Sequence, residues 1–151
     1  IPSLLEAKAL AQCMQEIPGA GGWICFSCKN GTQICEGTPI AECAAQLEEW
    51  DCIQAIGVNC TAPEYVQELI EQIRENSSKP IVVYPNSGEC YDAVCKTWHG
   101  AAEAQGYEAW AKKWYAAGAR LIGGCCRTTP KDIAAIHRWR CGLEGGQTGR
   151  R

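Results

Sequence analysis

Leu121-Ile-Gly-Gly-Cys-Cys-Arg-Thr-Thr-Pro130 is a short apolar run that passes through two glycines and two cysteines into a helix start. Thr129 can cap that helix, proline suits its first position, and Asp132 follows three residues after Thr129, as in a capping box. Adjacent cysteines rarely bridge each other, because the small ring strains the disulfide. We therefore expect Cys125 and Cys126 at the end of a buried strand, with both thiols free to bind a soft metal such as zinc.

A second stretch, Ala55-Ile-Gly-Val-Asn-Cys-Thr-Ala-Pro-Glu64, has the same design of apolar strand, small residue, cysteine and helix-opening proline. If the two strands are parallel members of one sheet, Cys60 lies at the same edge as Cys125 and Cys126. Three thiolates with a fourth position open are typical of a catalytic rather than a structural zinc site. These three cysteines are therefore the predicted zinc ligands.

Hydrophobic periodicity and turn residues predict one helix followed by four repeats of strand and helix. The first helix is expected over 3–17, with an apolar face of Leu10, Cys13, Met14 and Ile17. The strands are expected at 23–27, 52–59, 80–84 and 119–122, and an irregular stretch at 89–106. This alternation predicts an α/β fold with parallel strands joined by right-handed crossovers. It fits about four consecutive units of a (β/α)8 TIM barrel, which holds its active site at the carboxyl ends of the strands.

Three motifs in order carry a family resemblance: Gly57-Val-Asn-Cys60, Tyr84-Pro-Asn-Ser-Gly-Glu89 and Gly118-Ala-Arg-Leu-Ile-Gly-Gly-Cys-Cys-Arg-Thr-Thr-Pro130. Together they resemble the zinc-dependent homocysteine S-methyltransferases, and most closely the branch that uses S-methylmethionine as methyl donor. The resemblance runs from residue 1 to about residue 139. It implies that residues 1–141 are the C-terminal half of a homocysteine-binding (β/α)8 barrel domain, followed by a disordered tail at 142–151.

The resemblance also implies the chemistry. Zinc held by Cys60, Cys125 and Cys126 would deprotonate the thiol of homocysteine, which is mostly protonated when free at neutral pH. The thiolate would then accept a methyl group from a sulfonium donor and become methionine. S-methylmethionine is the favoured donor, and S-adenosylmethionine and betaine remain open. No protein nucleophile is needed for this displacement.

Substrate-lining residues are expected around the same strand ends. Asn86, Ser87 and Gly88 fall in the Pro-Asn-Ser-Gly-Glu run of the family, and Asn59 directly precedes a predicted ligand. A substrate-binding loop is one interpretation of the first three, and a structural turn is the other. Asn59 is expected either to hydrogen-bond next to the metal ligands or to serve plain turn chemistry.

Aromatic residues near the third strand end are candidates for binding a sulfonium, because aromatic faces attract cations by about 0.5–2 kcal/mol. Tyr84 ends the strand, and Tyr91 and Trp98 follow it. Each of them is explained equally well as an ordinary core or loop aromatic. Of the three, Tyr84 is taken as a predicted substrate-binding residue.

Composition and length bear on whether the chain could be a nucleic-acid-binding, membrane or secreted protein. The chain has 151 residues and a formal net charge of −3, which gives no support to nucleic-acid or anionic-membrane binding. No apolar run approaches the ~18 residues needed to cross a bilayer, and no signal peptide is visible at the start. A complete eight-stranded barrel needs roughly 200 residues or more. The chain opens without methionine, so we expect a fragment or a processed product.

The chain has twelve cysteines, which could belong to a secreted, disulfide-bonded protein or to a protein of the reducing cytoplasm. Regular helix and strand patterns and the missing secretion signal argue against a secreted disulfide scaffold and favour a reducing cytoplasm. The pair Cys25 and Cys28 has redox-motif spacing, yet it lacks a second such pair and a helix start directly after it. We therefore expect these two thiols to be structural.

A second functional hypothesis is a catalytically inactive zinc-binding or redox-sensing fragment that needs a partner chain. Four strands alone cannot close a barrel and leave sheet edges exposed. The chain is therefore expected either to self-associate or to associate with an N-terminal half. Its predicted partners are homocysteine and S-methylmethionine, or S-adenosylmethionine, with no nucleic acid and no membrane.

Overall fold

A four-stranded parallel sheet is the centre of the computed structural model, which describes residues 1–100 and 106–147. Its strands lie in the order β1 (Gly22–Phe26), β2 (Ile53–Asn59), β3 (Ile81–Tyr84) and β6 (Ala119–Ile122). The helices are α1 (Leu4–Gln15), α2 (Ile40–Glu48), α3 (Pro63–Asn76), α4 (Gly106–Ala117) and α5 (Pro130–Gln147). The predicted α/β alternation with parallel strands is confirmed.

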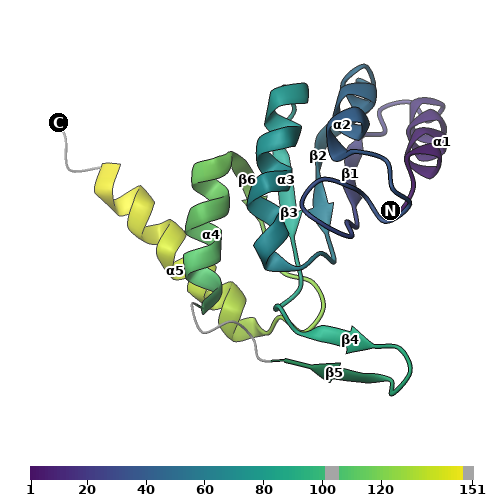
Figure 1. Cartoon of the computed structure of the whole chain (residues 1–151). Coiled ribbons are helices and arrows are strands. Elements are labelled where there is room, and N and C mark those ends of the chain that lie inside the picture. Colours follow the sequence, from purple (N-terminus) through teal and green to yellow (C-terminus); the bar gives the residue numbers. More distant parts are fainter. Residues whose placement is uncertain (101–105, 148–151) are drawn as a thin grey trace.

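The helices cover one face of this sheet, as Figure 1 shows for α2, α3 and α4. Side chains alternate between the two faces of a strand, so every second residue can reach the helices. In β3, Ile81 and Val83 belong to the main hydrophobic core, whereas Val82 belongs to a separate small cluster on the other face. The main core therefore lies between the sheet and the helices.

The second face of the sheet is apolar and partly open to solvent. Cys25, Ala55 and Val82 pack there with Tyr84. Large apolar side chains on the same strands are open to solvent, with Trp23 58% and Leu121 47% exposed. A part of a closed barrel presents its interior in this way, since the interior of the complete barrel is filled by side chains from all of its strands.

The first helix packs mainly through a different face from the one expected, although Met14 of the expected face also contacts the core. Leu4, Ala7 and Ala11 are buried, whereas Leu10 is 43% and Ile17 60% exposed. The buried residues also recur at helical spacing, and small alanines let the helix backbone approach the core closely. The expected face was defined by the large apolar side chains, and the small alanines that are in fact buried were not counted.

The segment after β3 is more ordered than expected. It contains an antiparallel hairpin of β4 (Cys90–Asp92) and β5 (Thr97–His99), which projects beyond the strand ends in Figure 1. The Asp92 carboxylate accepts hydrogen bonds from the backbone N–H groups of Val94 and Cys95, and these bonds form the turn. Tyr91 lies on this hairpin and is 53% exposed.

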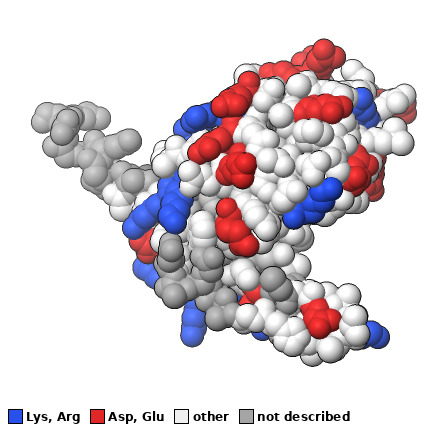
Figure 2. All heavy atoms as spheres, in the orientation of Figure 1, with Lys and Arg blue, Asp and Glu red and all other residues white. Residues whose placement is uncertain are grey.

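The last helix is longer than expected, because α5 continues to Gln147. Residues 142–147, expected in a disordered tail, are therefore helical, and 148–151 lie outside the described residues. Figure 2 shows acidic side chains over α2 and α3 and basic ones around α4 and α5. None of the helices in the described ranges is long and apolar enough to cross a membrane.

Candidate metal centre

Three cysteine sulfurs meet at the carboxyl ends of the strands. Cys60 directly follows β2, and Cys125 and Cys126 lie in the loop after β6. Their Sγ atoms all lie within 4.8 Å of one another, and those of Cys125 and Cys126 are 4.0 Å apart. Tetrahedral zinc with Zn–S bonds of about 2.3 Å needs sulfurs about 3.8 Å apart, so small side-chain rotations suffice. The donor set and its spacing fit a metal ion.

The strand between the two ligand loops supplies the backbone that holds them. At the end of β3, the Tyr84 carbonyl accepts a hydrogen bond from the Cys60 N–H at 3.3 Å. The Pro85 carbonyl accepts one from Cys125 N–H at 2.8 Å, and Ser87 N–H donates to the Cys126 carbonyl at 3.1 Å. The segment after β3 thus fixes both ligand loops.

Two threonine hydroxyls complete this framework, and neither role was predicted. Thr61 is 1% exposed; its Oγ1 accepts a hydrogen bond from Cys28 N–H and donates one to the Asn59 carbonyl. Thr128 Oγ1 donates to the Cys125 carbonyl at 2.7 Å, although the sequence indicated a helix cap. The cap itself forms between Thr129 and Asp132, whose Oδ2 accepts from the Thr129 N–H. The bond between Thr61 and Cys28 joins residues 33 positions apart, so only the tertiary structure identifies it.

In the absence of a metal, the surroundings of Cys60 keep its thiol protonated. Burial, together with the adjacent thiols of Cys125 and Cys126, raises the pKa of Cys60 to about 12. A cation bound among the sulfurs would reverse this balance, because a coordinating thiol is deprotonated outright. Cys60 also has a left-handed backbone, with φ of 48°. The ligand loop is therefore held in a conformation that few non-glycine residues adopt.

An ion pair that was not predicted from the sequence joins the two loops next to the metal centre. Arg127 follows Cys126 and has a left-handed φ of 66°. Its guanidinium bonds the Glu89 carboxylate through two N–H groups, and Ser87 Oγ donates to the same carboxylate at 2.9 Å. The Arg127 and Ser87 donors hold the pKa of Glu89 below its usual range. The loop after β3 and the loop after β6 are thus joined by charge as well as by backbone.

The predicted substrate residues lie around the sulfurs in different ways. Asn59 Nδ2 donates to Cys60 Sγ at 3.5 Å, and its Oδ1 is buried without a hydrogen-bond partner among the described residues. Asn86 Oδ1 is buried and unpartnered in the same sense. Ser87 is 8% exposed, and Gly88 has a φ of 102°, which favours glycine. The chain thus bends at Gly88, and the Oδ1 atoms of Asn59 and Asn86 have no hydrogen-bond partner among the described residues.

Tyr84 adjoins the metal centre through its backbone, because its carbonyl accepts a hydrogen bond from Cys60 N–H. It ends β3 and is half-buried against Cys25 and Val82. Tyr91 lies on β4 of the hairpin, and Trp98 of β5 is its partner in the strand register.

The described cysteines outside the cluster include three buried thiols. Burial raises the pKa of Cys25 to about 11 and the pKa of Cys28 and Cys43 to about 12 each. Such thiols are protonated at neutral pH and are poor nucleophiles. The spacing of Cys25 and Cys28 therefore marks core packing rather than a redox pair.

Comparison with known proteins agrees with this arrangement. A family model described as homocysteine S-methyltransferase matches residues 1–139. The chain belongs to the homocysteine S-methyltransferase family. Members of this family that it resembles include homocysteine S-methyltransferase YbgG of Bacillus subtilis, 51% identical over 95% of this chain and 46% of that protein. A selenocysteine Se-methyltransferase of Brassica oleracea is 42% identical over 91% of this chain and 41% of that protein.

The structural comparison supports the fold of a homocysteine S-methyltransferase. The metallated form of the homocysteine methyltransferase MmuM from Escherichia coli superposes with a TM-score of 0.75 at 34% identity. The match covers 91% of this chain and 42% of that chain. The chain thus spans less than half the length of these relatives. The fold is that of a partial TIM barrel.

Proposed function

We propose that this chain is the metal-binding half of a zinc-dependent homocysteine S-methyltransferase that uses S-methylmethionine as methyl donor. The observation that carries the proposal is the convergence of Cys60, Cys125 and Cys126, with sulfurs within 4.8 Å, at the carboxyl ends of parallel strands. Three sulfur ligands and one open position match a catalytic zinc site. Zinc bound there would lower the pKa of an incoming thiol, so that it reacts as a thiolate at neutral pH.

The protein side chains position the reactants rather than react. Homocysteine would lose its thiol proton, its sulfur would bond the donor methyl carbon, and the donor would leave as a neutral thioether. With S-methylmethionine, both products are methionine. The Tyr84 ring at the end of β3 would favour the cationic sulfonium. The buried Oδ1 atoms of Asn59 and Asn86 would accept hydrogen bonds from substrate N–H groups.

The donor assignment is supported by the likeness of Tyr84-Pro-Asn-Ser-Gly-Glu89 to the branch that uses S-methylmethionine. Comparing S-methylmethionine with S-adenosylmethionine and betaine in one assay tests it. A reducing compartment is implied, because the three thiols must stay free. We place the enzyme in the cytoplasm on that ground.

Zinc content decides the site. The purified chain, kept reduced, is expected to hold about one zinc, as three thiolates form one site. Cys125→Ser is expected to lose it, whereas Cys13→Ser, an exposed cysteine outside the cluster, is expected to keep it. Absence of zinc from the wild-type chain would refute the site.

Turnover decides between the two functional hypotheses. Methylation of homocysteine is measured with the chain alone and with the N-terminal half of a relative added. Turnover in either case supports the methyltransferase. Zinc binding with no turnover in both cases would favour the inactive zinc-binding or redox-sensing fragment instead.

A further inference from the structure

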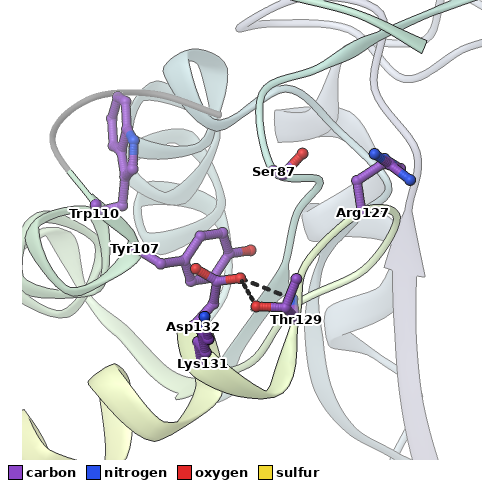
Figure 3. Close-up of a pocket in the computed structure, with 8 residues that line it drawn as sticks. Ser87, Tyr107, Trp110, Arg127, Thr129, Lys131 and Asp132 are labelled. Carbon is purple, nitrogen blue, oxygen red and sulfur yellow. Dashed lines mark hydrogen bonds between the residues drawn. The ribbon is translucent and has the colours of Figure 1, made fainter. Parts of the chain in front are cut away.

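A pocket of about 270 Å³ lies beside the metal loop, between the first turns of α4 and α5 and the segment after β3. Figure 3 shows its walls. The side chains that carry the argument are Ser87, Tyr107, Trp110, Arg127, Lys131 and Asp132. None of them was predicted from the sequence as a pocket residue except Ser87.

Trp110 presents an unsatisfied donor to this pocket. The residue is 9% exposed, and its Nε1 is buried with no hydrogen-bond partner among the described residues. In Figure 3 the indole nitrogen lies on the ring edge turned toward the cavity. A buried donor without a partner costs about 1–3 kcal/mol, so an acceptor on a ligand would be favoured there.

Lys131 and Asp132 place opposite charges on the same wall. Lys131 is exposed and has no ion-pair partner within residues 1–100 and 106–147. The Asp132 carboxylate uses Oδ2 to accept from the Thr129 N–H and Oγ1, and no described residue donates to its Oδ1. One free cation and one free carboxylate oxygen thus line the cavity together.

Arg127 is not available in the same way, because its guanidinium already bonds both carboxylate oxygens of Glu89. The apolar part of the wall comes from the rings of Tyr107 and Trp110, which are both buried. Figure 2 shows further basic side chains around α4 and α5, a setting that attracts anionic groups. The pocket therefore offers one carboxylate oxygen, Asp132 Oδ1, that can accept from an ammonium group. It also offers two donors for a carboxylate, Lys131 Nζ and Trp110 Nε1.

Hydrogen bonds to shared backbone atoms connect the pocket with the loop that carries Cys125 and Cys126. Tyr107 Oη and Cys125 N both donate to the Pro85 carbonyl, each at 2.8 Å. Ser87 lines the pocket, and its N–H bonds the Cys126 carbonyl. Burial and the nearby Asp132 and Cys125 raise the pKa of Tyr107, so its hydroxyl stays a neutral donor.

We propose that this pocket binds the α-ammonium and α-carboxylate groups of the methyl donor, an S-alkylated amino acid. Lys131 and Trp110 Nε1 receive the carboxylate, and Asp132 Oδ1 receives the ammonium. The assignment rests on the proposed function for the identity of the donor. It gives this half of the protein a substrate site that is independent of the metal.

The test is binding of S-methylmethionine to the complete chain by calorimetry. Lys131→Gln is expected to raise its Kd about tenfold, because a charged hydrogen bond is lost. Trp110→Phe keeps the ring but not the donor and is expected to raise the Kd about threefold or more. Trimethylsulfonium, which has no amino-acid end, is expected to bind both variants as it binds the wild type.

A matched control separates an effect at the pocket from a general loss of surface charge. Lys112→Gln removes an exposed lysine of α4 whose partner is Glu108 and which does not line the pocket. It is expected to leave the Kd unchanged. Wild-type affinity in Lys131→Gln and Trp110→Phe, or no binding of S-methylmethionine to the wild type, would overturn the proposal.

Failure of the proposed function gives a different pattern. A chain without zinc or turnover would refute the methyltransferase assignment, whereas the calorimetric comparison would still show whether the pocket recognises the amino-acid end. Conversely, zinc binding and turnover with unchanged affinities in both pocket variants would refute the pocket alone.

Discussion

Arg127 and Glu89 join the two loops of the metal centre by a bidentate ion pair, with Nε 3.0 Å from Oε2 and Nη2 3.3 Å from Oε1. The pair spans residues 38 positions apart in the chain. Planar, two-point bonding fixes orientation as well as distance. Because Arg127 follows Cys126 directly, the ion pair restrains the backbone of the ligand loop immediately after Cys126.

Glu89→Gln is therefore expected to weaken zinc binding more than it weakens the fold. Loss of this support should raise the zinc Kd about tenfold, as loss of outer contacts does in other metal sites. The free energy of unfolding of the metal-free chain should change little, since the Arg127 side chain is 51% exposed and solvent screens the pair. Chelator competition and urea denaturation measure the two quantities.

The control for this prediction is Glu108→Gln, which breaks the exposed ion pair with Lys112 on α4. It should leave the zinc Kd unchanged. Equal zinc affinity in Glu89→Gln and Glu108→Gln would show that the Arg127 pair is only a surface contact.

Thr61→Val is expected to destabilise the strand end that carries Cys60. The buried hydroxyl accepts from Cys28 N–H and donates to the Asn59 carbonyl, and valine would leave both groups unpaired. The expected loss is about 1–3 kcal/mol in the free energy of unfolding. Thr61→Ser retains the hydroxyl and should lose clearly less, and equal losses would count against the hydrogen bonds as the cause.

Gly57→Ala should disrupt the pairing of β2 with β3. A Cβ at this position would overlap the backbone carbonyl of Val82, its partner in the register. Backbone cannot yield as a flexible side chain does, so the expected loss is about 3 kcal/mol or more. Gly22→Ala, where a Cβ meets the tip of Met14 at 3.6 Å, should be tolerated. Thermal denaturation compares the two, and similar melting temperatures would refute the clash.

Glu48 is expected to make stability depend on acid pH. Hydrogen bonds from the hydroxyls of Ser77 and Ser78 hold its pKa below the ordinary value of 4.5. A carboxyl with a lowered folded pKa stabilises the fold above its unfolded pKa, and this stabilisation is lost as pH falls through the folded value.

Glu48→Gln should therefore be less stable than the wild type at pH 7, with a difference that shrinks as the pH falls below 4.5. Denaturation at a series of pH values measures this difference. Glu49→Gln, an exposed neighbour, is the control. A constant gap between wild type and Glu48→Gln down to low pH would contradict the linkage.

Much of the architecture could be predicted because it depends on local pattern. Strand and helix signals recur along the chain, and parallel strands bring their carboxyl ends to one edge of a sheet. Cys60, Cys125 and Cys126 each follow such an end, so their convergence could be predicted before any coordinates. The metal they hold and the residues that bind substrate stay predictions.

Other features could not be predicted from local pattern. The face that α1 buries depends on two alanines fitting against the core, and the hairpin after β3 depends on turn bonds of Asp92. The extension of α5 to Gln147 contradicts the weak local helix signal after residue 141. For α1 and the hairpin, packing or a specific hydrogen bond outweighed propensity.

The sequence by itself determined the order of elements, the parallel sheet and the trio of cysteines at its edge, because hydrophobic period and strand polarity are local properties. Only the tertiary structure decided how the site is held and what surrounds it. The Arg127–Glu89 pair, the hydroxyl of Thr61 and the pocket beside Trp110 join segments far apart in the chain. Such contacts depend on distances in three dimensions, which no periodicity along the chain encodes.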